Sequence, residues 1–297
     1  MSDKQSKNEM TGRGGECDFK RKRNNDRPVD TSSPVIQAFQ LFQDELDLKH
    51  NKHERLVKMS RDITIESKRI IFLLHRIVGA EDPASILDQA LEKLKIVQQT
   101  KFHPVAMELQ NEDPYQFIRA YTAGVQEYIE ALSFYYYLKE KRLITLEEVQ
   151  RDLFFNGPLV EQDDCKQMKS DTAEVKGDNS MSILITPVDF MLGLADLTGE
   201  LMRLSINSAG AGDLDVPFSV CDFLKTIQTG FMTFGNLCKE VSKKMYTLKQ
   251  SLQKVETACY TLQIRGSEVP KHMLADILST ATMSGPSHFA EDSLVDI

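Results

Sequence analysis

Two stretches of the sequence place pairs of carboxylates in apolar surroundings, and these pairs are the residues best suited to chemistry. The stretch AYTAGVQEYIEALSFYYYL has only Glu127 and Glu130 as charged residues, although a chain with 27% charged residues would place about five there. The stretch PVDFMLGLADLTGELM contains Asp196 and Glu200, one helical turn apart. At spacings of three or four residues, each pair projects from one face of its helix.

Burying four carboxylates is costly, because each loses its hydration and the like charges repel one another. A divalent cation would offset this cost, because two helices that each offer two carboxylates can converge on a metal, as in metal-binding bundles. The di-iron bundles use Glu-x-x-His pairs, whereas neither helix here has a histidine. Ligation by oxygen alone favours Mg²⁺, with Mn²⁺ as the second choice, over iron or zinc. The alternative is that each pair forms buried salt bridges with a neighbouring helix, and composition alone leaves both interpretations open.

Four basic residues on the first predicted helix are candidates either for those salt bridges or for contacts to nucleic-acid phosphates. They are Arg61, Lys68, Arg69 and Arg76. For any one of them, a solvated helix face with acidic partners four residues away is the alternative. The histidines form no HxxxH arrangement, and no role is assigned to them.

Helical patterning extends over most of the chain, and capping signals mark where the helices begin. Starts are predicted at Ser33, Asp82, Asp113, Thr145, Thr186 and near Asp215. The first helix continues to about Gly79, and the last covers about 238–264. No stretch has the alternation typical of strands. The predicted fold is therefore all-α, a multi-helix bundle of long antiparallel helices.

Three further residues of the second acidic stretch are given structural roles. Asp189 follows Thr186 by three residues, the position of a helix-capping partner, so it is left outside the site. Gly193 and Gly199 each cost roughly 1 kcal/mol relative to Ala inside a helix. These glycines therefore predict that another helix approaches closely.

Polar segments frame a single helical domain predicted at 34–279. Residues 1–33 are predicted to be a disordered basic tail, 156–180 a mobile acidic loop, and 280–297 a flexible C-terminal tail. The N-terminal tail has a basic cluster typical of a nuclear import signal, with a solvated basic patch as the alternative. This cluster consists of Lys20, Arg21, Lys22 and Arg23.

Composition restricts the classes of protein to which the chain can belong. No apolar run approaches the roughly 20 residues of a membrane span, and none follows Met1 as in a signal peptide, so neither a membrane nor a secreted protein is expected. Five cysteines without a CxxC pair argue against a disulfide framework or a thiolate zinc site and favour a reducing compartment. The net charge of -8 means that nucleic-acid binding requires a local basic patch or a partner subunit.

Three long stretches resemble the translin family: FQDELDLKHNKHERLVKMSRDITIESKRIIFLLHRI, LITPVDFMLGLADLTGELMR and VSKKMYTLKQSLQKVETACYTLQIRGSEVPKHMLADI. The resemblance covers nearly all of the chain from Ser32 to Ile277. It implies a translin-like helical subunit that assembles with translin into a closed hetero-oligomer, a Mg²⁺-dependent endoribonuclease acting on single-stranded RNA. One implied substrate is the passenger strand in RNA silencing.

The family's catalytic acidic residues fall on QEYIE and ADLTGE, and thus on Glu127, Glu130, Asp196 and Glu200. We expect them to hold one or two Mg²⁺ ions, with Glu127 or Glu130 as an alternative general base. The resemblance implies both a cytoplasmic and a nuclear location. It also allows a rival function, a non-catalytic scaffold that binds single-stranded nucleic acid, including DNA, or DNA-repair factors and accompanies translin to the nucleus or in RNA trafficking.

Overall fold

The computed structural model describes residues 33–156, 180–235 and 238–265. The basic cluster at 20–23, the interior of the predicted acidic loop and the predicted C-terminal tail lie outside these residues. The chain divides into two compact units, Met1–Asp47 and Leu48–Ile297. In the first unit the described residues form only the beginning of helix α1.

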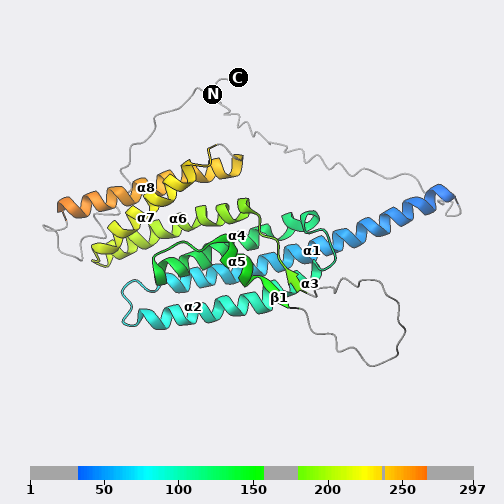
Figure 1. Cartoon of the computed structure of the whole chain (residues 1–297), viewed down its shortest axis with the longest axis horizontal. Helices are drawn as coiled ribbons and strands as arrows, with labels where there is room; N and C mark the ends of the chain where they lie inside the picture. Colours follow the sequence, from blue (N-terminus) through cyan, green and yellow to red (C-terminus); the bar gives the residue numbers. More distant parts are fainter. Residues whose placement is uncertain (1–32, 157–179, 236–237, 266–297) are drawn as a thin grey trace, which may run out of the picture. The chain divides into compact units, whose positions relative to one another are not determined.

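The predicted all-α class is confirmed (Figure 1). The elements are α1 (Pro34–His75), α2 (Pro83–Val97), the π-helical turn η1 (Gln98–Phe102), α3 (His103–Glu108), α4 (Pro114–Glu140), α5 (Leu146–Asp152), β1 (Phe154–Asn156), β2 (Ser180–Ser182), α6 (Pro187–Gly210), α7 (Asp215–Met232) and α8 (Lys239–Arg265). The strands pair antiparallel with Phe155 opposite Met181. Alternation could not reveal them, because each has only three residues.

Local capping explains where the two helices with paired carboxylates begin. At α4, the side chain of Asp113 accepts a hydrogen bond from the backbone N–H of Tyr115 at 3.0 Å, and Pro114 occupies the first turn. At α6, Thr186 caps the helix by accepting from the N–H of Asp189 at 3.1 Å. Satisfying these N–H groups is worth about 1 kcal/mol for each helix. Both predicted starts are confirmed.

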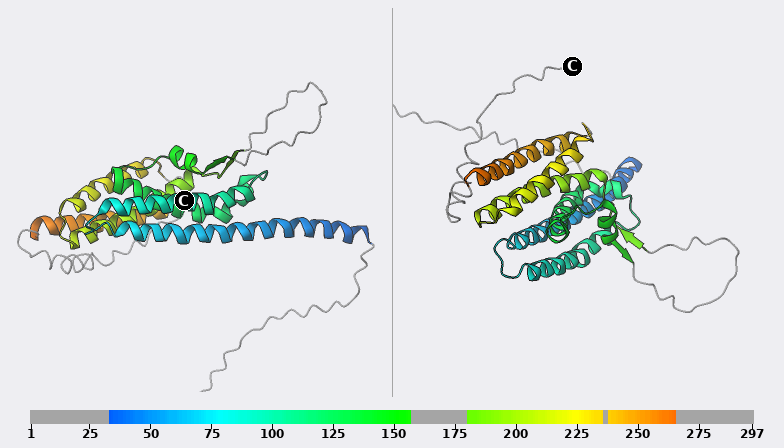
Figure 2. Two further views of the ribbon diagram at one scale, coloured as in Figure 1. Left: turned by 90° about the horizontal axis from the view of Figure 1, so that it is seen from below. Right: turned by 60° about the vertical axis from the view of Figure 1, so that its left-hand side comes forward.

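In the second unit, α6 packs against α4, α7 and α8, while α4 packs against α1 and α2 (Figures 1 and 2). Helices that follow each other closely in the chain, such as α6 and α7, run antiparallel. In contrast, α4 and α6 run in the same direction, since Thr122 contacts Asp189 and Ile129 lies against Gly193. Residues near the middle of both helices therefore lie at the same level.

Helix α4 is buried on nearly all sides, as its composition predicted. The largest fully buried side chains of the described residues include the aromatics Tyr121, Tyr128, Tyr137, Phe102 and Phe134. Burial of each such side chain contributes roughly 2 to 3 kcal/mol. A charged side chain on this helix is thus held in a rigid, mostly apolar setting. None of the described helices is both long and apolar enough to cross a membrane.

Candidate active site

Two glycines allow α4 to lie very close to its neighbours. A Cβ atom on Gly193 of α6 would lie 2.8 Å from the Cβ of Ile129 on α4. A Cβ atom on Gly124 of α4 would lie 2.8 Å from the carbonyl oxygen of Ser60 on α1. The predicted close approach is confirmed at Gly193. It is wrong at Gly199, where a Cβ would meet nothing within 4 Å.

Asp189 fixes the register between α4 and α6 and lies outside the site, as predicted. Its Oδ1 accepts hydrogen bonds from Gln126 Nε2 at 2.8 Å and from the hydroxyl of Thr122. Its Oδ2 accepts from the hydroxyl of Thr186 at 2.6 Å. Because Oδ1 binds two side chains of α4 and Oδ2 binds the cap of α6, Asp189 aligns the two helices, and the next turns of each face each other.

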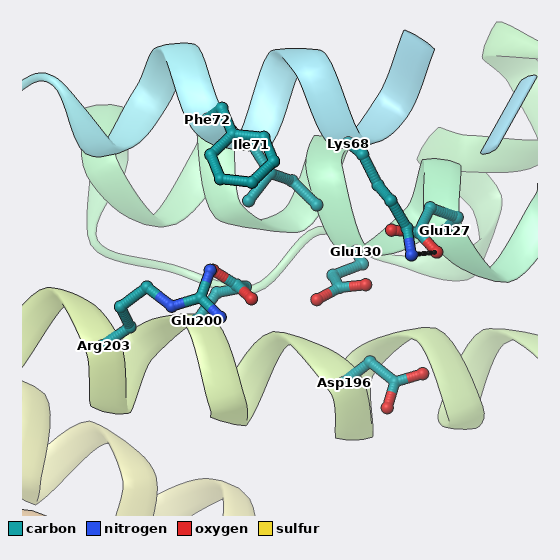
Figure 3. Close-up of a pocket in the computed structure, with 8 residues that line it drawn as sticks. All are labelled: Lys68, Ile71, Phe72, Glu127, Glu130, Asp196, Glu200 and Arg203. Carbon is teal, nitrogen blue, oxygen red and sulfur yellow. Dashed lines mark hydrogen bonds and ion pairs between the residues drawn. The ribbon is translucent and has the colours of Figure 1, made fainter. Parts of the chain in front are cut away.

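Those turns bring all four predicted carboxylates to one cavity of about 430 Å³ (Figure 3). Glu127 and Glu130 reach it from α4, and Asp196 and Glu200 reach it from α6. Three residues of α1 and one more of α6 complete the lining; these are Lys68, Ile71, Phe72 and Arg203. The cavity is thus an acidic pocket with a basic and aromatic rim.

Two of the carboxylates face a lysine from a neighbouring helix. Lys68 Nζ of α1 lies 3.5 Å from Glu127 Oε2. Lys244 of α8 forms an ion pair with Asp196. Each lysine is more than one-third exposed, so each pair contributes little net stability and can be exchanged for another cation.

Glu200 has a more buried partner that sequence analysis missed. His75 Nε2, on the last residue of α1, lies 2.6 Å from Glu200 Oε2, and the two side chains are only 10% and 13% exposed. The same oxygen accepts a hydrogen bond from Arg203 Nη1 at 3.0 Å. The imidazole packs on Phe134 with a ring-centroid distance of 4.9 Å. Held in this way, His75 fixes the orientation of the Glu200 carboxylate.

Glu130 is the most buried of the four, with 8% of its surface exposed, and it has no hydrogen bond or ion pair within the described part of the chain. Burial raises its pKa to about 8, and the negative charges of Glu127, Asp196 and Glu200 add to the rise, against a lowering by Lys68. Burial also raises the pKa of Glu127, with Lys68 as the main opposing influence. The pocket therefore favours any added positive charge, a proton included.

The donor set fits a hard divalent cation in its chemistry, since it offers carboxylate oxygens alone and one of them is buried without a positive partner. The side chains are not arranged as a closed cage: within residues 33–156, 180–235 and 238–265, no three His, Cys, Asp or Glu groups converge as metal ligands. A bound ion would have to replace Lys68, Lys244 and Arg203 as partners of the carboxylates.

Among the four basic candidates from the sequence, only Lys68 lines the cavity. Arg69 pairs instead with Glu66 on its own helix at 2.7 Å, while Arg61 and Arg76 are exposed. Of these four, Lys68 alone forms a salt bridge with a predicted carboxylate, at Glu127, while Asp196 forms one with Lys244 of α8. The places of Phe72, His75 and Arg203 at or beside the carboxylates, and the pairing of Lys244 with Asp196, were not predicted from the sequence.

Comparison with known proteins establishes the family. Residues 51–266 match the model of the translin family. The chain belongs to the translin family. It is 50% identical over 285 residues to translin-associated protein X of Pongo abelii, covering 92% of this chain and 97% of that protein.

More distant relatives extend this family assignment. The translin-associated protein X homolog of Schizosaccharomyces pombe is 27% identical, covering 83% of this chain and 95% of its own length. Translin of Mus musculus is 25% identical, covering 78% and 94% respectively. The crystal structure of apo-NeC3PO shares the fold, with a TM-score of 0.52 at 20% identity, over 73% of this chain and 93% of that one.

Proposed function

We propose that this translin-family chain is the catalytic subunit of a Mg²⁺-dependent endoribonuclease, assembled with translin and acting on single-stranded RNA. The observation that carries the proposal is the convergence of Glu127, Glu130, Asp196 and Glu200 from two helices on one cavity. The similarity to proteins named translin-associated protein X supports the choice of partner.

The residues of the pocket divide into two groups with different tasks. The four carboxylates would hold one or two Mg²⁺ ions, which supply charge neutralisation at a phosphodiester and activation of water when bound. Lys68 and Arg203, both about half exposed at the rim, are placed to meet phosphate oxygens of the strand. His75 holds Glu200 in position from the side away from solvent.

Protonation of Glu130 competes with metal binding. At pH 7 a carboxyl with a pKa of about 8 retains its proton, so the pocket carries one negative charge fewer. Glu130 would have to release this proton to hold a Mg²⁺ ion, because the proton and the ion compete for the same oxygens. We therefore expect the Mg²⁺ concentration needed for cleavage to fall as the pH rises from 6 towards 8.

The test is cleavage of a labelled single-stranded RNA by the full chain co-purified with translin, in Mg²⁺ and in EDTA. The variants are Glu130→Gln and Glu127→Gln, with Glu92→Gln on the exposed face of α2 as the matched control. Cleavage in Mg²⁺ by the wild type and the control, with loss in both pocket variants and intact complexes by light scattering, would support the proposal.

Two outcomes would contradict the proposal. Cleavage that persists in Glu130→Gln would mean that the pocket does not carry the reaction. If the wild-type complex binds the RNA in Mg²⁺ but does not cleave it, the nuclease proposal is wrong and the scaffold function is favoured.

A further inference from the structure

The rim of the acidic pocket contains a large aromatic side chain that packing does not explain. Phe72 of α1 is 68% exposed, although it lines the same cavity as the four carboxylates. Its neighbours Ile71 and Leu73 on the helix are buried. Single exposed apolar residues are common on protein surfaces, so exposure alone says little. Its place beside the charged groups that face the cavity is the informative feature.

Figure 3 shows how the rim is arranged around the carboxylates. Phe72 and Arg203, from facing helices, lie at one end of the cavity, and Lys68 with Glu127 lies at the other. Glu130 lies between the two ends. An aromatic ring and a guanidinium therefore border one end of the cavity, and an ammonium group borders the other.

This combination matches what an unpaired nucleotide presents. A base in a single strand has a free π-face that stacks on aromatic side chains, whereas a base inside a duplex has both faces covered. The two phosphates that flank this base form ion pairs with Arg or Lys side chains. Neither Lys68 nor Arg203 is buried, so both can turn from their carboxylates to a strand that enters the cavity.

We propose that Phe72 is the stacking platform for one unpaired nucleobase of the RNA whose backbone enters the acidic pocket, with Arg203 and Lys68 meeting the adjacent phosphates. This inference rests on the proposed function and adds to it the group that selects single-stranded over duplex RNA. A platform on α1 next to carboxylates of α4 and α6 fixes one base relative to the phosphodiester that is cut.

The test measures RNA binding rather than cleavage, using the full chain in complex with translin, in EDTA. Fluorescence anisotropy would report the affinity for a short single-stranded RNA, for the same RNA with one abasic nucleotide at successive positions, and for its duplex. Phe72→Ala and Phe72→Leu remove the π-face, and Phe72→Trp retains it. Tyr260→Ala on α8, an aromatic residue of similar exposure, is the matched control.

Removal of the aromatic face should weaken single-strand binding by roughly 5- to 150-fold, the range of one base–aromatic stack. Duplex binding should be unchanged in the same variants. Phe72→Trp and Tyr260→Ala should bind as the wild type does. One abasic position should weaken wild-type binding by a similar factor and add no further loss in Phe72→Ala, because the same stack is absent in both.

Three results would overturn the inference. The first is that Phe72→Ala and Phe72→Leu bind single strands as tightly as the wild type does. The second is that one abasic nucleotide weakens RNA binding by the same factor in Phe72→Ala as in the wild type. The third is dissociation of the complex in both Phe72→Ala and Phe72→Trp but not in Tyr260→Ala, which would make Phe72 a subunit contact. None of these readouts requires cleavage, so an inactive wild-type complex would contradict only the nuclease proposal.

Discussion

Replacement of Glu130 by Gln should stabilise the metal-free chain, and the gain should grow with pH. The pKa of Glu130 rises from its usual 4.5 to about 8 because the side chain is buried beside other carboxylates. Between these two pH values the folded protein retains a proton that the unfolded chain releases. The stabilising contribution of the protonated group is thus complete below pH 4.5 and lost as the pH rises towards 8.

The size of the effect follows from about 1.4 kcal/mol for each pKa unit. At pH 6 ionisation of the unfolded chain lowers the stability of the wild type by about 2 kcal/mol, and above pH 8 by at most about 5 kcal/mol. Glutamine resembles the protonated acid in shape and has no such dependence. The difference in unfolding free energy, variant minus wild type, should therefore increase through this range.

The assay is urea unfolding of the full chain in EDTA at several pH values from 5 to 9, for wild type, Glu130→Gln and the solvated control Glu92→Gln. Addition of Mg²⁺ should reduce the gap between wild type and Glu130→Gln at pH 8, since the ion binds the ionised carboxylate. A difference that stays flat with pH, or that matches the control, would refute the burial and charge argument for Glu130.

Further predictions concern the packing and the partners of the carboxylates. Gly193→Ala should destabilise the chain by about 1 to 3 kcal/mol in urea unfolding, because its Cβ would clash with α4, whereas Gly199→Ala, with open space around it, should be neutral or stabilising by up to about 1 kcal/mol; equal effects would contradict this. His75→Ala should lower kcat for RNA cleavage by roughly 10- to 100-fold with KM little changed, because the substitution frees Glu200 to turn. His75→Gln should restore part of kcat. An unchanged kcat in His75→Ala would remove the positioning role. Lys244→Met should tighten Mg²⁺ binding in calorimetric titration, because it removes the cation that competes at Asp196; weaker binding would argue against a metal there.

Local chemistry made most of the fold predictable. Helix starts depend on a capping residue, a proline and the next turn, so Asp113 and Thr186 could be found from the sequence alone. The acidic pairs stood out because two charges in an otherwise apolar helix are rare. The β1–β2 pair escaped notice, since three-residue strands carry too little pattern.

Apart from Lys68, the partners that other helices supply to the carboxylates could not be predicted, because they depend on how separate helices align. His75 lies at the end of α1, 125 residues from Glu200, and no local pattern links the two. Lys244 reaches Asp196 from α8 for the same reason. The register becomes visible only once Gly193 and Asp189 have set α4 against α6.

The most direct measurement of the central claim is Mn²⁺ titration, followed by electron paramagnetic resonance, of the full chain in complex with translin. We predict a bound ion that Mg²⁺ displaces and that is lost when one carboxylate from each helix is neutralised, in the double variant Glu130→Gln and Asp196→Asn. Binding of Mn²⁺ that is as tight in this variant as in the wild type would contradict a metal site formed by α4 and α6.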